Sequence, residues 1–221
     1  MSKLSNSVNA CLDKMAAVGG SGKGSHGEQA VFKICEQIYQ KYGGILYHSY
    51  EYRVDKSKKG NIKKDDNGNL FVENLGSTTE IDVLLVTPYR IFPIEVKAYN
   101  ADKIILTNKE IIGCRYNSKS PVHQNEMHCR HLYPNIFQVI PEGDVDYIKP
   151  IVVFVDKCKF ADKRTPEQKK YIRATILNLL KETIEELNVP GEYEINLQSM
   201  DYRLKEACTK YEKYLPCREV T

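Results

Sequence analysis

Two short apolar runs separated by a turn constrain the fold of this chain more than any other stretch. The runs are Ile81–Val86 and Ile91–Val96, and Thr87–Arg90 lies between them with Pro88 at its second position. Proline suits the second position of a turn, so the stretch predicts a β-hairpin. Apolar runs this continuous are typical of strands covered on both faces, inside a core.

Both runs nevertheless carry charged residues. Side chains alternate faces along a strand, so Glu95 and Lys97 share a face. If Pro88 begins a two-residue turn, Asp82 lies opposite Glu95 and Glu80 lies opposite Lys97. A one-residue bulge would change this register.

The pairing of these charges has a chemical consequence. Two adjacent carboxylates repel each other, and burying either is costly. A divalent cation relieves both costs, and Mg²⁺ prefers hard oxygen ligands with water in its remaining positions. A neighbouring ammonium can neutralise charge on a phosphate oxygen or help to activate water. The alternative is that Asp82, Glu95 and Lys97 form only a salt bridge at a strand end.

Composition sets wide bounds. The 221 residues fit one generous domain or one domain with an appendage, and 42% hydrophobic residues suffice for a core. A net charge of +3 does not identify a polyanionic partner. No apolar stretch approaches the ~20 residues of a membrane span, and Met1–Val18 does not resemble a signal peptide. Seven scattered cysteines without Cys-x-x-Cys predict reduced thiols and a cytoplasmic location.

The N-terminal region combines a helical pattern with a glycine-rich link. Apolar spacing predicts an amphipathic helix over residues 4–18, and Gly19–Ser25 follows as a flexible joint. The joint contains Gly-Lys, but Gly24 stands where a phosphate loop needs Ser or Thr. Lys23 and the local backbone amides remain candidates for phosphate contact.

A second helix is predicted over residues 26–42, ended by Gly43-Gly44. Its core-facing stripe includes Val31 and Cys35, and their spacing from Glu28 puts this acid on the same stripe. A carboxylate there either complements the helix dipole or approaches a metal ion.

A basic segment interrupts the middle of the chain. After a predicted strand over 45–52, residues 53–64 hold six basic side chains against one acid. A turn at 65–69 and a returning strand at 70–72 follow. Such a run is either a solvated loop or an arm that contacts phosphates, with candidate contacts at Lys58, Lys59, Lys63 and Lys64.

The remaining pattern predicts further strands and helices. Short strands are expected at 104–106, 111–112 and 151–155, and a helix at 122–133 with Ser120 as its N-cap. The final third predicts a long helix opened by Thr165-Pro166-Glu167 and stopped by Pro190-Gly191, then an edge strand over 193–197 and a helix over 200–215.

The helix over 122–133 also carries potential metal ligands. His123, His128, Cys129 and His131 are crowded on it. Neighbours at spacings of one to three cannot all face one metal ion, and no second ligand pair has zinc-site spacing, so a structural zinc site is disfavoured.

Taken together, four pieces of the chain resemble the nuclease-related domain, a branch of the PD-(D/E)xK nuclease superfamily. The pieces occur in the family's order and span roughly residues 22–155; they are Gly22–Glu28, Thr79–Val86, Ile94–Lys97 and Tyr116–His128.

The resemblance implies an α/β fold with a restriction-endonuclease-like core, in which helices flank a central mixed β-sheet. It divides the chain into an N-terminal helix and link (1–21), a nuclease-like core (22–156, with a basic insertion at 53–69) and a mainly helical C-terminal extension (157–221) packed on the core.

The resemblance also assigns roles. It implies that Asp82 and Glu95 bind Mg²⁺, for which Mn²⁺ can substitute, and that Lys97 orients or activates the attacking water. It now favours a metal-proximal Glu28. The backbone carbonyl of Val96, between the Glu95 and Lys97 side chains, is a further candidate ligand. Gln124 belongs to the helix that closes the active site, and His128 matches a position that contacts the scissile strand.

The implied activity is hydrolysis of phosphodiester bonds, most readily in DNA, as in an endonuclease; such domains often occur in mobile-element or host-defence settings. The alternative is a nucleic-acid-binding module of the same fold that cleaves nothing without a partner protein. No membrane partner is expected, and a homodimer is left open.

Overall fold

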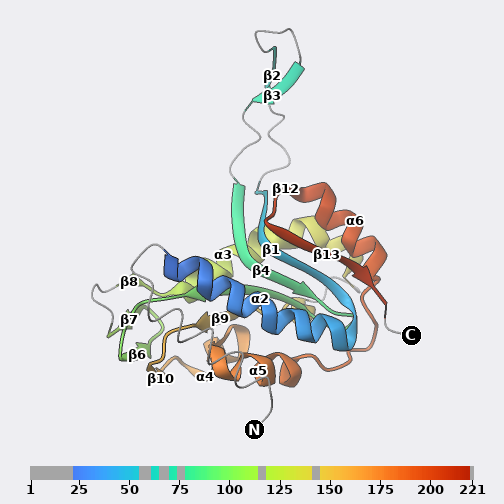
Figure 1. Ribbon diagram of the computed structural model, residues 1–221. Coiled ribbons are helices and arrows are strands. Elements are labelled where there is room, and N and C mark those ends of the chain that lie inside the picture. The colour runs from blue at the N-terminus through green and yellow to red at the C-terminus, as the bar shows by residue number, and fades with distance from the viewer. Residues whose placement is uncertain are drawn as a thin grey trace.

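A mixed central sheet with helices on both faces forms the body of the protein (Figure 1). The computed structural model describes residues 22–54, 61–64, 70–73, 78–113, 118–140 and 145–219. The predicted helix over 4–18 and turn over 65–69 lie outside these residues. The predicted α/β class is confirmed.

The central sheet has seven strands in the order β11-β9-β5-β4-β1-β12, with β13 also paired to β1. β5, β9 and β11 run parallel, whereas β4 is antiparallel to β5, and β1 to β4. The strands are β1 Gly44–Arg53, β4 Thr78–Val86, β5 Ile91–Lys97, β9 Ile151–Phe154, β11 Arg173–Ile176, β12 Cys208–Lys210 and β13 Lys213–Arg218.

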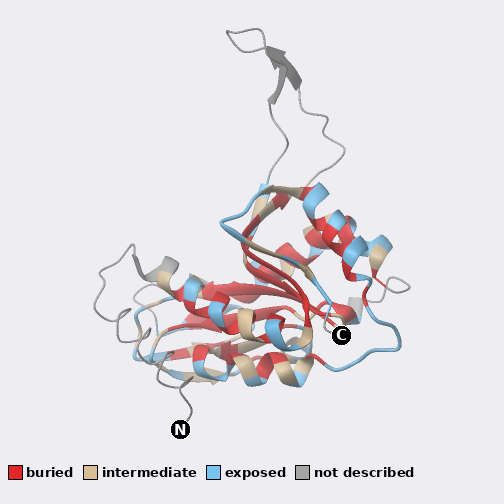
Figure 2. Ribbon diagram, turned by 45° about the vertical axis from the view of Figure 1, so that its right-hand side comes forward, coloured by how far each residue is buried: buried red, intermediate tan, exposed pale blue. Residues whose placement is uncertain are grey.

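Two pairs of helices cover the sheet. α2 (Gly22–Tyr42) and α5 (Leu180–Leu187) pack on one face, and α3 (Pro121–Ile136) and α6 (Leu197–Ala207) pack on the other. The strands between them are largely buried (Figure 2). None of the helices in the described ranges is long and apolar enough to cross a membrane.

Two smaller sheets complete the fold. β10 (Lys159–Asp162), β6 (Lys103–Leu106), β7 (Glu110–Ile112) and β8 (Ser118–Lys119) form one, which packs against Phe154 and its neighbours. The basic segment contributes β2 (Asn61–Lys64), which pairs with β3 (Leu70–Glu73) in the other. The prediction of β3 is confirmed. A loop over 61–64 is wrong, because these residues pair with β3 as a strand, whereas the phosphate-contacting arm stays a prediction.

Glycine fixes the junction between α2 and β1. Gly43 has φ 74° and donates its N–H to the Tyr39 carbonyl at 2.9 Å, which ends the helix. A Cβ on Gly44, with φ 126°, would lie 1.9 Å from the Val86 carbonyl oxygen, so only glycine fits. At its other end α2 begins at Gly22, so the predicted glycine-rich joint ends earlier than expected.

The C-terminal third contradicts the predicted succession of long helices. Thr165 caps a helix as expected, but that helix, α4, covers only Pro166–Tyr171 and is followed by β11. The predicted long helix resumes after β11 only as α5, and the predicted strand over 193–197 is absent. The predicted helix over 200–215 is confirmed as far as Ala207 in α6, after which β12 and β13 follow.

The cause is the exposed backbone at both edges of the sheet. β11 pairs with β9, and β12 and β13 pair with β1. These pairings satisfy backbone N–H and C=O groups on the edges of β9 and β1, which would have no partner if the same segments were helical. Apolar residues four apart also fit a strand, since four is a multiple of two as well as close to 3.6.

A buried ion pair at the end of β10 gives a stability prediction. Arg164 is buried and donates to both Asp162 carboxylate oxygens, at 3.0 and 2.8 Å. Asp162→Asn would leave the guanidinium without its counter-charge, so we expect a loss of about 3 kcal/mol in urea unfolding at pH 7. The exposed pair Arg173–Glu186 is the control: Glu186→Gln should cost less than about 1 kcal/mol.

The loss should depend on pH. Burial raises the pKa of Asp162, but hydrogen bonds from Arg164 outweigh it and hold the pKa below its usual value. The stabilisation is therefore complete above the unfolded pKa of about 3.9 and disappears as pH falls through the lower folded value. An Asp162→Asn penalty that stayed constant down to pH 2 would contradict this account.

Candidate active site

The central hairpin opens where its charged residues begin. Its predicted register is confirmed from Val86–Ile91 to Val83–Ile94. The ladder does not continue to the predicted pairs of Asp82 with Glu95 and Glu80 with Lys97. β5 remains paired with β9 as far as Lys97. β4 and β5 therefore separate beyond the Val83–Ile94 pair, on the side away from the turn. The candidate site lies in this fork.

The strand on the other side of β4 is irregular at the same level. Ser49 in β1 has φ 53°, outside the range of a regular strand. β1 and β4 pair at His48–Val83 and again at Tyr50–Ile81, with Ser49 and Asp82 between these pairs. Tyr50 and Ile81 join the apolar cluster under α3 and α6, although regular alternation from Val83 puts them on the opposite face. This reversal explains why Asp82 leaves the regular alternation of core-facing residues.

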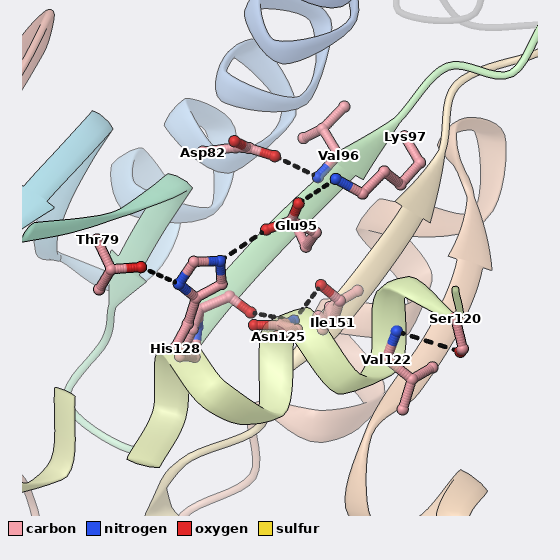
Figure 3. A network of polar contacts seen from close by, with 11 residues as sticks. Thr79, Asp82, Glu95, Val96, Lys97, Ser120, Val122, Asn125, His128 and Ile151 are labelled. Carbon is pink, nitrogen blue, oxygen red and sulfur yellow. Dashed lines mark hydrogen bonds and ion pairs between the residues drawn. The ribbon is translucent and has the colours of Figure 1, made fainter. Parts of the chain in front are cut away.

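Asp82 fills the opening between the strands. Its Oδ2 accepts a hydrogen bond from the Val96 backbone N–H at 2.6 Å (Figure 3). Burial, and next the charge of Glu95, raise the pKa of Asp82 to about 8, while the Val96 N–H and Lys97 act in the opposite direction. The environment therefore resists a second negative charge beside Glu95.

Glu95 is the most deeply buried acid of the group, with 1% of its side chain exposed. Lys97 donates to its Oε1, so the predicted shared face is confirmed. Burial lowers the pKa of Lys97, but the charge and hydrogen bond of Glu95, together with the charge of Asp82 and a smaller effect of Tyr99, raise it overall. The lysine is thus held as an ammonium against one oxygen of Glu95.

His128 from α3 approaches the other oxygen. Its Nε2 lies 3.2 Å from Glu95 Oε2, although the two atoms are not aligned for a hydrogen bond. Its Nδ1 is 3.0 Å from Thr79 Oγ1, and its carbonyl accepts from the Tyr52 hydroxyl at 2.7 Å. His128 therefore faces protein groups with both ring nitrogens (Figure 3); the predicted contact with a scissile strand stays a prediction.

Two neighbours on α3 have opposite environments. Gln124 is exposed and makes none of the contacts that join the cluster, so its predicted catalytic role also stays a prediction. Asn125 is fully buried, and its Nδ2 donates to the carbonyls of Pro93 and Ile151 at 3.2 and 2.8 Å. Asn125 thereby fixes α3 to β5 and β9.

Glu28 lies on the face of α2 that packs on the sheet. Burial, followed by the charges of Glu212, Glu80 and Glu95, raises its pKa, while Lys97 acts in the opposite direction. Its Oε2 is 3.8 Å from Nε2 of buried His48. Glu28 is thus within electrostatic range of Glu95 and Lys97 in the fork, while its predicted proximity to a metal ion stays a prediction.

Other predicted residues are less defined. Lys58 and Lys59 lie outside the described residues, and only the backbone of Lys23, Lys63 and Lys64 is described. Over the described ranges, no three His, Cys, Asp or Glu side chains converge as a closed metal cage. A cation at Asp82 and Glu95 would therefore take further ligands from backbone or water.

Sequence reasoning missed several contacts of the cluster. Thr79 and Asn125 were inside motifs but received no role, because a polar side chain gives no sign of what it will contact. His48 directly follows the apolar residues 45–47 of β1, and a histidine at the end of that run was the available signal. The direction of each side chain depends on the fork and on the irregularity at Ser49.

A comparison with known protein families identifies the class of the chain. A family model described as the nuclease-related domain matches residues 23–155, more than half of the chain. The fold and site define a nuclease-related α/β protein. The chain belongs to the nuclease-related domain family. Searches of curated proteins and of solved structures found no match.

The two α3 neighbours form a matched test of the site's framework. Asn125→Ala should lower the free energy of unfolding by about 1–3 kcal/mol, because it removes the donor that joins α3 to two strands. Gln124→Ala should change it by less than about 0.5 kcal/mol, because that side chain is exposed. Chemical denaturation measures both; equal effects would contradict the described contacts.

Proposed function

We propose that this chain is a metal-dependent nuclease that hydrolyses phosphodiester bonds, with DNA as the favoured substrate and endonucleolytic cleavage as its mode. The observation that carries the proposal is the fork, where Asp82 and buried Glu95 meet beside the Lys97 ammonium. Membership of the family supports a nuclease-related role.

A divalent cation fits the fork on chemical grounds. Glu95 Oε2 is buried and has no hydrogen-bond donor among the described residues. The raised pKa of Asp82 reflects burial and the charge of Glu95, both of which a cation would offset. Asp82, Glu95 and the Val96 carbonyl would hold Mg²⁺ or Mn²⁺, with Glu28 reaching the cation through a coordinated water. When bound, such a cation polarises the phosphate and lowers the pKa of a coordinated water.

The protein's own groups would supply position and charge. The Lys97 ammonium, kept charged by Glu95, would stabilise negative charge on the attacked phosphate and orient the water. Glu95 is held between Lys97 and His128, which limits its rotation. The basic segment, with Lys58, Lys59, Lys63 and Lys64, would bind flanking phosphates together with Lys23.

The proposed location is the cytoplasm. Seven scattered cysteines without a Cys-x-x-Cys motif favour reduced thiols, the state expected in that compartment. A mobile-element or host-defence setting is the biological context that we propose for the activity.

Removing the charge of Lys97 tests the reaction. Lys97→Met keeps the aliphatic stem, and we expect it to slow cleavage of supercoiled or linear DNA by roughly 10²–10³-fold or more, because a stabilising charge is lost. Asp82→Asn should have at least as large an effect. Chelation of Mg²⁺ should abolish wild-type cleavage, and added Mg²⁺ or Mn²⁺ should restore it.

The control is Lys170→Ala, an exposed lysine of α4. It should cleave at the wild-type rate, and circular dichroism should show that all variants are folded. Undiminished cleavage by pure, folded Lys97→Met and Asp82→Asn would overturn the proposal. Salt-sensitive DNA binding without cleavage in any metal would favour the non-catalytic binding module.

The basic segment makes a separate prediction about binding. DNA affinity measured without divalent cation should fall as salt rises, because phosphate contacts release counterions. Lys63→Ala and Lys64→Ala should each lower the slope of log affinity against log salt by about one, with little dependence on DNA sequence. Filter binding at several salt concentrations measures the slope, and unchanged slopes would remove this segment from the interface.

A further inference from the structure

Two exposed lysines lie side by side just beyond the candidate site. β6 begins at Lys103 and β10 begins at Lys159, and the two strands pair in parallel with these residues opposite each other. Paired residues of neighbouring strands point to the same face of a sheet. The next pair, Ile104 and Phe160, packs into the core against Phe154. Lys103 and Lys159 therefore face away from that core, toward solvent.

This arrangement puts like charges next to each other, which is destabilising in a sheet. Within the described ranges, neither ammonium has an ion-pair or hydrogen-bond partner. The acids beside the pair are Asp102 and Asp156. The two oxygens of Asp156 accept the backbone N–H groups of Tyr99 at 2.7 Å and of Asn100 at 2.8 Å, whereas Asp102 is exposed. An anion from outside the chain would offset the repulsion between the lysines.

Hydrogen bonds fix the backbone around both lysines. The Lys159 N–H donates to the Asp102 carbonyl at 2.9 Å, and the two contacts of Asp156 hold the connection from β5 to β6. The Val155 N–H donates to the Lys97 carbonyl at 3.0 Å, which joins this region to the end of β5. The lysine pair therefore has a defined position relative to Lys97 in the fork.

A cavity adjoins the pair at the carboxyl ends of the parallel strands β9 and β11. Its volume is about 310 Å³, and its lining includes Val155, Lys159 and Asn178. In open α/β sheets, ligands bind outside the carboxyl ends of the strands. Lys97 is the last residue of β5, the parallel neighbour of β9, so the cavity and the candidate site open at the same end of these strands.

The fork separates this pair from the basic segment at 53–64. That segment follows the end of β1, and the chain returns at the start of β4, whereas Lys103 and Lys159 follow the ends of β5 and β9 (Figure 1). β4 runs antiparallel to β5, so the start of β4 and the end of β5 lie at the same end of the hairpin. A nucleic-acid strand that crosses this end would meet the basic segment on one side of the fork and the lysine pair on the other.

We propose that Lys103 and Lys159 bind backbone phosphates of the nucleic-acid substrate on the β9 side of the fork. This inference rests on the proposed function, and it names a contact surface that is separate from the basic segment. Two ammonium groups attract phosphates without reading the bases, so the contact is independent of sequence. The pair holds the strand while the fork acts on a neighbouring phosphodiester.

DNA affinity measured without divalent cation tests the pair. Lys103→Ala and Lys159→Ala should each lower the slope of log affinity against log salt by about one, because each removes a phosphate contact. The double variant with arginine at both positions keeps the charges and should keep the wild-type slope. Asp102→Asn removes the exposed acid and should strengthen binding. Lys170→Ala is the matched control, since Lys170 precedes β11 and lies at the opposite end of the sheet, and it should bind as the wild type does.

Cleavage kinetics separate this inference from the proposed activity. The double alanine variant should raise KM for DNA roughly 5–20-fold and change kcat by less than about twofold, because the lysines contact phosphates beside the reacting one. If the wild type binds DNA but cleaves none in any metal, the proposed function fails and the binding slopes still test the pair. Wild-type slopes and KM in the folded double variant would overturn the inference and leave the nuclease activity standing. Absence of salt-dependent DNA binding by the wild type would overturn both.

Discussion

The separation of β4 from β5 determines where chemistry can occur in this fold. β5 keeps its pairing with β9 but loses β4 beyond Ile94, so the Val96 N–H has no strand partner on that side. A backbone donor in such a place must find an acceptor. Asp82 supplies it with a carboxylate. The same hydrogen bond that completes the sheet therefore brings a negative charge beside Glu95.

The charges around the fork are unequal. Asp82, Glu95 and Glu28 are acidic, and Lys97 is the cation that contacts Glu95. One ammonium does not balance three carboxylates, and burial makes the excess more costly than it would be in water. The raised pKa values of Asp82 and Glu28 express this cost. Either protons or a bound cation must offset it, and the latter provides a physical reason for a metal-dependent activity.

The central part of this arrangement was predictable from sequence because its signals are local. The apolar runs and Pro88 define the hairpin, and alternation along one strand is enough to pair Glu95 with Lys97. The opening of the hairpin was not predictable, because it accompanies an irregularity of β1 and β4 around Ser49, while β5 continues along β9 on its other edge. The C-terminal strands failed for a related reason: apolar residues spaced by four satisfy two periods, and only the free edges of the sheet decide between them.

A histidine approaches an acid on each face of the sheet. On the α3 side, His128 is held by Thr79 and faces Glu95; on the α2 side, His48 is held by Glu212 and faces Glu28. The first arrangement lies wholly within the region matched by the family model, whereas the second requires a residue beyond it. The C-terminal tail thus adds a further negative charge, Glu212, that raises the pKa of Glu28.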